Sequence, residues 1–190
     1  MKKNLALCFL MLYTISFSFA QIFRGEGETK NGTAAFSIHF VEYTGYRYLF
    51  YIDDVSIFLD EDNMVRLEAV LEKFAEWEDM AAHEQISLTK TIDSITFTSF
   101  HFNYTFFKEP LILYFVFTGG SVETVGSFTG SDETPAVRYT LYIDTTLERI
   151  TPFRLDSKTV KEMQLALSSE KLAEARDAYE RKRALEEMFN

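Results

Sequence analysis

The chain has 190 residues and a formal net charge of −10, with 47% apolar and 25% charged residues. These fractions lie near the globular average, which excludes a wholly disordered chain and a protein with several membrane spans. A single hydrophobic core usually occupies roughly 100 to 200 residues, so the length predicts one domain. The negative charge argues against general binding to nucleic acids or anionic membranes, because both require local positive potential.

The start of the chain has the pattern of a secretory leader. Lys2 and Lys3 precede an almost unbroken apolar run from Leu5 to Phe19, and small residues stand just before Gln21. The run is shorter than the roughly 20 apolar residues that a membrane span needs. We therefore predict a cleaved signal peptide over residues 1–20 rather than a retained membrane anchor.

Cleavage at that point would also remove the only cysteine of the chain, Cys8. A cysteine-free mature chain has no disulfide, no thiol nucleophile and no cysteine ligand for zinc. No later apolar run has the length of a membrane span. We expect a soluble exported protein, either periplasmic or extracellular.

Two aromatic and β-branched runs, Ala35 to Tyr43 and Tyr46 to Asp53, are separated by Thr44-Gly45. Glycine supplies the positive φ of a tight turn, so this pattern predicts a hairpin in which Tyr43 pairs with Tyr46. The implied register gives two apolar faces: Phe36, Ile38, Phe40, Leu49 and Tyr51 on one, and Val41, Tyr46, Tyr48, Phe50 and Ile52 on the other. We therefore expect a cover on each face, from helices, a second subunit or a ligand.

An amphipathic helix follows. Asp60-Glu61-Asp62 supplies capping acids at its start, and we expect it to end near His83 or Glu84. Apolar residues recur at helical spacing between these ends, and Phe74 and Trp77 are predicted to be buried against the sheet.

Three or four strands are predicted after this helix. Thr91 to Tyr104 changes its apolar phase, which favours a bulge near Thr98 or Ser99. Leu111 to Thr118 is apolar on both parities and predicts a central strand buried on two faces. Val122 to Phe128 suggests a short edge strand, and Val137 to Ile143 alternates like a half-buried strand.

A second helical region begins at Asp156 or Ser157 and continues to the C-terminus, with a kink expected at Ser168-Ser169. We expect the segment from Val160 to Leu167 to cover the second face of the sheet. The predicted fold is α+β, a mainly antiparallel sheet of five or six strands in the order ββαβββα. We expect residues 21–168 to form the globular domain and residues 169–190 to form a C-terminal helical extension.

Motifs for chemistry are mostly lacking. His83-Glu84 has no second histidine at zinc-binding spacing. His39 and His101 lie on predicted strands and could meet across the sheet, but a strand histidine is more often an ordinary partly buried residue. We assign no catalytic residue, no metal site and no cofactor.

An acidic ridge on the predicted helix consists of Glu68, Glu72, Glu76 and Asp79, at spacings that put all four on one face. Like charges at these spacings oppose helix formation slightly. The ordinary interpretation is a solvated face, and the functional one is a surface for a protein partner. The ridge is the candidate interaction site of this sequence.

These observations favour a non-catalytic binding or interaction module of the cell envelope, with an unknown protein partner or a second copy of the chain. One alternative is an envelope hydrolase that uses a carboxylate pair from Asp53, Asp54 or Asp144. Another is a protein that binds an apolar ligand.

Overall fold

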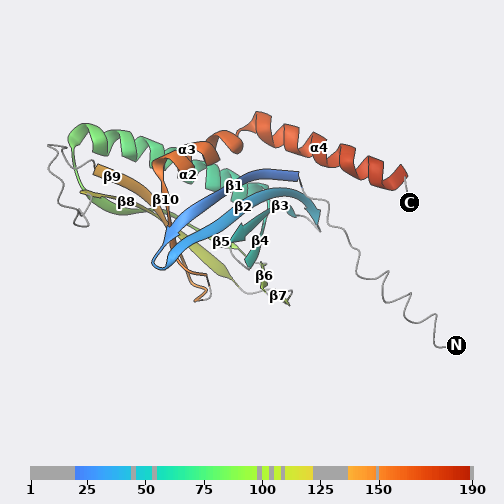
Figure 1. The fold of residues 1–190 in the computed structure, drawn as a ribbon, viewed down its shortest axis with the longest axis horizontal. Coiled ribbons are helices and arrows are strands. Elements are labelled where there is room, and N and C mark those ends of the chain that lie inside the picture. Colours follow the sequence, from blue (N-terminus) through green and yellow to red (C-terminus); the bar gives the residue numbers. More distant parts are fainter. Residues whose placement is uncertain are drawn as a thin grey trace.

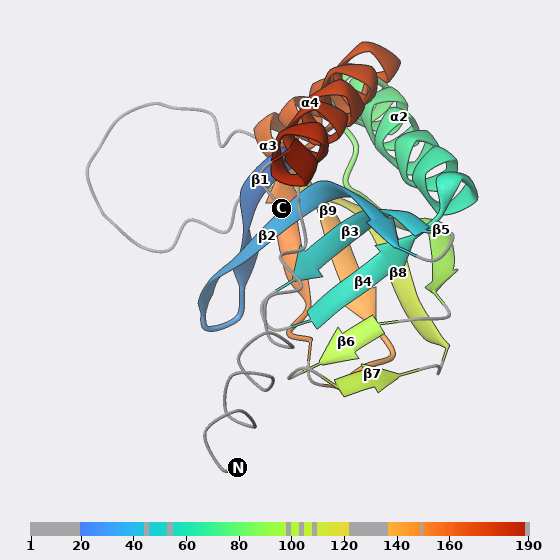
Figure 2. The ribbon, with the colours of Figure 1, turned by 90° about the vertical axis from the view of Figure 1, so that its right-hand side faces the viewer.

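The computed structural model describes residues 20–43, 46–52, 55–97, 100–102, 105–107, 110–121, 137–148 and 150–188. Within these ranges, ten strands form one antiparallel sheet in the order β5-β8-β9-β10-β1-β2-β3-β4-β6-β7. The sheet curls into a half-barrel, and the helices lie together on one side of it (Figures 1 and 2). The strands are β1 Ala20–Thr29, β2 Gly32–Tyr43, β3 Tyr46–Ile52, β4 Val55–Leu59, β5 Leu88–Phe97, β6 Phe100–Phe102, β7 Thr105–Phe107, β8 Leu111–Ser121, β9 Val137–Thr145 and β10 Phe153–Asp156. The helices are α2 Glu61–Glu84, α3 Ser157–Ala166 and α4 Ser169–Met188.

The α+β class and the antiparallel sheet are confirmed, but the expected five or six strands are too few. Eight of the ten strands have four or more residues, and β6 and β7 have three each. Strands β1, β4, β7 and β10 were not predicted. The β1 sequence contains Gly25 and Gly27, so it lacks a strand-like composition. It also begins at the expected leader boundary.

The two glycines of β1 allow aromatic rings to lie directly on its backbone. A Cβ on Gly27 would collide with the Phe153 ring, and one on Gly25 would collide with the rings of Phe36 and Phe23. These glycines lower the strand propensity of β1, which is why it was not predicted. The packing of the core nevertheless requires them.

The predicted pairing of Tyr43 with Tyr46 is confirmed, but the face assignment of this hairpin is wrong. A register shift between Phe40 and Tyr43 leaves Phe40 opposite Tyr48 rather than Leu49. The bulge therefore changes which residues share a face beyond it. The core face carries Phe36, Ile38, Phe40, Tyr48, Phe50 and Ile52.

One large core lies between the sheet and the helices. All three helices contribute to it, through residues such as Phe74 of α2, Met163 of α3 and Tyr179 of α4. The expectation that the Val160 to Leu167 segment covers the opposite face is therefore wrong, because Val160, Met163 and Leu167 join the same cluster as α2. The opposite face carries a separate small cluster of Val41, Leu49 and Phe58, with Tyr46 and Tyr51 packed against it.

Helix α2 has the predicted ends. The Asp60 carboxylate accepts a 2.8 Å hydrogen bond from the Asn63 amide at the N-terminus, and Gln85 closes the C-terminus with a φ of 55°. Phe74 is fully buried as predicted, whereas Trp77 is only partly buried. The Trp77 ring meets Phe117 edge-on, with centroids 5.9 Å apart.

The segment predicted as one bulged strand from Thr91 to Tyr104 is divided between distant parts of the sheet. Strand β5 pairs with β8, whereas β6 pairs with β4 and β7. The phase change in the sequence therefore marks a change of partner strand, and Thr98 and Ser99 themselves lie outside the described residues.

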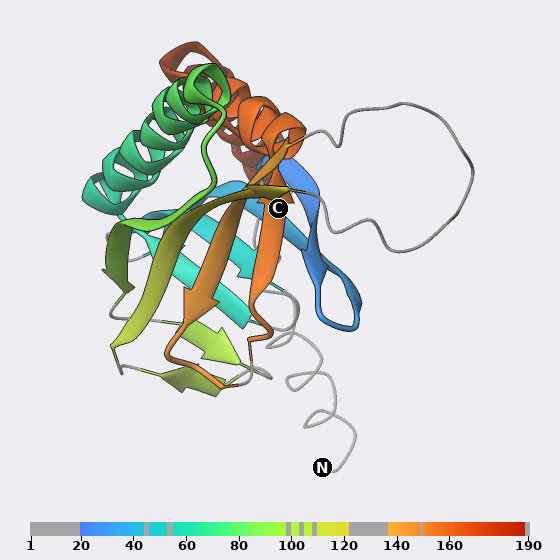
Figure 3. The same cartoon turned by 90° about the vertical axis from the view of Figure 1, so that its left-hand side faces the viewer.

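Strand β8 lies between β5 and β9, as the expected central position requires (Figure 3). The predicted burial on two faces is wrong, because Leu113 and Phe115 are inaccessible while Tyr114, on the other face, is 37% exposed. The half-buried strand from Val137 to Ile143 is confirmed as β9. The predicted edge strand from Val122 to Phe128 lies outside the described residues.

Candidate functional site

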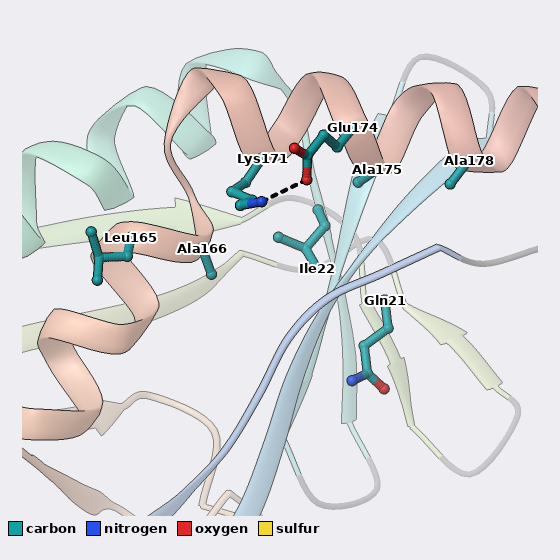
Figure 4. A pocket seen from close by; sticks show the side chains of 8 residues that line it. All are labelled: Gln21, Ile22, Leu165, Ala166, Lys171, Glu174, Ala175 and Ala178. Atoms are coloured by element: carbon teal, nitrogen blue, oxygen red, sulfur yellow. Dashed lines mark hydrogen bonds and ion pairs between the residues drawn. The ribbon is translucent and has the colours of Figure 1, made fainter.

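A groove of about 430 Å³ opens between the start of β1 and the junction of α3 with α4. Figure 4 shows Ile22 of β1 pointing toward α4 while Gln21 points in the opposite direction. The complete lining is Gln21, Ile22, Leu165, Ala166, Lys171, Glu174, Ala175 and Ala178. Volumes of this order are typical of small-ligand sites, which are mostly apolar with few polar groups.

A β-bulge fixes the floor of the groove. Gln21 pairs with His39 and Phe23 with Ile38, so Ile22 is the additional residue of the bulge. A bulge redirects one side chain out of the regular alternation. Ile22 therefore lies on the helix side together with Phe23, where it packs against the core only in part.

The break between α3 and α4 forms the wall of the groove. The predicted kink is confirmed as two helices separated at Leu167 and Ser168, and the Leu167 amide donates to the Met163 carbonyl at 3.0 Å. Leu167 is buried at this break. Leu165, two residues earlier, is 72% exposed at the rim of the groove.

Small side chains keep the groove open. Ala175 and Ala178 lie one turn apart on the same side of α4, facing β1 across the groove (Figure 4). At one end Lys171 Nζ bonds Glu174 Oε2 at 2.7 Å. The site therefore offers an apolar surface with one exposed ion pair, and no nucleophile or base faces a buried acid within it.

Sequence reasoning missed this groove completely. Ile22 adjoins the leader boundary, and the alanines of α4 are common in any helix. The only available signal was the expected kink at Ser168-Ser169, which gave no indication that a groove forms beside it.

A polar cluster connects α4 with strand β3 and with the start of α2. The Glu61 carboxylate accepts hydrogen bonds from Arg47 Nη1 at 3.0 Å and from the Tyr48 hydroxyl at 3.3 Å. Arg176 Nη2 of α4 lies 3.7 Å from the same carboxylate. Burial, then the nearby Glu61 charge, raises the pKa of Tyr48, so its hydroxyl stays a donor at neutral pH. The cluster is structural.

The acidic ridge lies along α2 as the helical spacing requires. Glu72, Glu76 and Asp79 are exposed, and Glu68 is partly buried. Glu76 Oε2 forms an ion pair with Lys73 at 2.8 Å. The ridge as a surface for a protein partner stays a prediction.

The two strand histidines do not meet. His39 belongs to β2, and His101 of β6 pairs with Ser56 of β4, with β3 lying between β2 and β4. Three strand spacings of about 4.8 Å separate the two backbones by roughly 14 Å, too far for a shared metal ion. Among the described residues, no group of three or more potential ligands could hold a metal.

The proposed carboxylate pair finds no support in the described part of the chain. Asp53 and Asp54 lie outside the described residues. Asp144 accepts a 2.8 Å hydrogen bond from the neighbouring Thr145 amide. That local contact is structural, and no second acid is placed opposite it by the described pairs.

No protein-family model matches the chain, and no curated protein or solved structure shows significant similarity to it. None of the described helices has the length and apolar character that a membrane-spanning segment requires.

Proposed function

We propose that this protein is a binding module of the cell envelope and that the groove between β1 and the α3–α4 junction is its binding site. The observation that carries the proposal is the lining of the groove, which is apolar except for Gln21 and the Lys171–Glu174 pair. Such a surface favours a small amphipathic ligand with an apolar chain and one polar or charged group.

The position of each group defines how that ligand would lie. Its apolar part would cover Ile22, Ala175 and Ala178, and its polar end would lie beside the Lys171–Glu174 pair. Leu165 is exposed at the rim and would lose water contact when the ligand binds. Burial of this side chain contributes to binding at about 25 cal/mol per Å² of apolar surface.

A fluorescence titration with anilinonaphthalene sulfonate, an apolar ring system with one anionic group, tests the proposal. Ala178→Trp fills the groove, and we expect it to weaken probe binding about tenfold, a loss of about 1.4 kcal/mol. Ala173→Trp is the matched control, because Ala173 is exposed on α4 and does not line the groove. Equal affinities for both variants and the wild type would place probe binding elsewhere and refute the proposal.

A further inference from the structure

A serine and a histidine are hydrogen-bonded on the face of the sheet that points away from the helices. Ser37 Oγ and His39 Nε2 of β2 are 2.9 Å apart. Residues two apart on a strand share a face, and the intervening Ile38 points into the core. This distance lies within the range for a nucleophile and its general base in serine hydrolases.

Neighbouring strands supply two further groups at this position. Arg24 of β1 pairs directly with Ser37, and so does Tyr51 of β3. Side chains of directly opposed residues lie on the same face, with Cβ atoms about 4.5 to 5.5 Å apart. The Tyr51 ring meets the His39 ring edge-on at 5.4 Å. Ser37 thus lies between a cation and an aromatic ring that restrains its histidine.

The accessibility and protonation of these groups suit a nucleophilic role. Ser37 and His39 are half-buried, and Arg24 is exposed. Burial lowers the pKa of the His39 imidazole, so the ring is neutral at pH 7 and can accept a proton.

We propose that Ser37 is a nucleophile activated by His39, with Arg24 placed to stabilise an oxyanion, and that this site reacts with activated esters. This activity goes beyond the proposed binding function and uses the opposite face of the sheet. The two proposals can therefore fail independently.

The reaction balances without a cofactor. His39 Nε2 takes the hydroxyl proton as Ser37 Oγ bonds to the ester carbonyl carbon, and the carbonyl oxygen becomes the oxyanion near Arg24. The ester C–O bond then breaks, and the His39 proton goes to the departing alcohol. Water then bonds to the acyl carbon as His39 takes its proton, the bond from that carbon to Ser37 Oγ breaks to release the acid, and His39 returns the proton to Ser37 Oγ.

A fluorophosphonate probe tests the nucleophile directly, because Ser37 Oγ would displace fluoride and form a stable phosphonate ester. We expect mass spectrometry of the purified wild-type protein to place the label on Ser37. Ser37→Ala should abolish labelling. Ser94→Ala is the matched control, since Ser94 of the edge strand β5 is also half-buried and directly opposite a tyrosine, Tyr114, but has no histidine in its strand pairing.

The roles of the neighbours are tested by labelling rates. His39→Gln keeps a polar group in place but removes the base, and we expect the rate to fall about 100-fold. Arg24→Gln should slow labelling, and Arg24→Lys should restore part of the rate. Circular dichroism confirms that each variant is folded. No label on Ser37 in the wild type, or an unchanged rate in folded His39→Gln, would overturn the proposal.

Discussion

At the scale of single residues, stability depends on rings that fill the space between sheet and helices. Phe74 is completely buried and lies 5.4 Å, centroid to centroid, from Phe117. Phe74→Ala should lower the free energy of unfolding by about 3 to 5 kcal/mol, through lost burial and a residual cavity. Urea denaturation measures this loss, with Val65→Ala on the exposed face of α2 as the control. An unchanged midpoint for Phe74→Ala would contradict the described core.

The acidic ridge leads to a prediction about one carboxyl group. The pKa of Glu68 is raised, first by burial and then by the charges of Glu72 and Glu61. Glu72→Gln should therefore lower the Glu68 pKa while leaving it above its ordinary value, because the burial remains. NMR titration of the Glu68 carboxyl measures the shift. Glu76→Gln, two turns away, should leave this pKa unchanged.

The raised pKa also predicts how stability depends on pH. Glu68 contributes to the free energy of unfolding because its pKa is higher in the folded state than in the unfolded state. This contribution is fully present below the unfolded-state pKa and is lost as the pH rises through the folded-state pKa. Glu72→Gln should reduce this loss and stabilise the protein at neutral pH by about 0.2 to 0.5 kcal/mol. A less stable Glu72→Gln variant would show that repulsion within the ridge is not the dominant effect.

At the scale of elements, α4 is attached to the sheet by packing more than by charge. The Tyr179 ring meets Phe40 edge-on at 5.3 Å, while Arg183 forms a 2.8 Å ion pair with Glu42 on the surface. Tyr179→Ala should destabilise the protein by about 3 kcal/mol, and Arg183→Ala by less than about 1 kcal/mol. Thermal unfolding of the two variants compares them. Similar small effects would mean that α4 is an independent arm.

Local signals predicted some elements well and others not at all. The ends of helix α2 could be placed to within a residue or two, because Asp60 supplies a cap and the apolar stripe has one period. The faces of the β2–β3 hairpin could not, because the bulge before Tyr43 leaves no mark in the alternation of apolar residues. The groove depends on the β1 bulge and on a helix break, which composition does not encode. Ser37 and His39 stand two apart on a predicted strand, so the sequence could have placed them on one face, although it does not show that they are hydrogen-bonded.

At the scale of the whole molecule, export stays a prediction. It depends on Lys2, Lys3 and the apolar run before Gln21. N-terminal sequencing of the protein from its native host should begin at or within a few residues of Gln21. Recovery of a cytoplasmic protein that retains Met1 would contradict it.

The arrangement of layers explains why the groove lies where it does. All three helices cover one side of the curled sheet, and α3 and α4 meet above the start of β1 (Figures 1 and 4). The helix break and the β1 bulge face each other there, so neither fills the space between them. The groove is therefore a product of topology and does not require a dedicated motif.

The most direct test of the binding role is a two-dimensional amide NMR titration with anilinonaphthalene sulfonate. We predict that the shifted amides cluster at Ile22, Ala166, Ala175 and Ala178, which line the groove. Shifts centred on the opposite apolar cluster of Val41, Leu49 and Phe58, or no saturable shifts at all, would contradict the account.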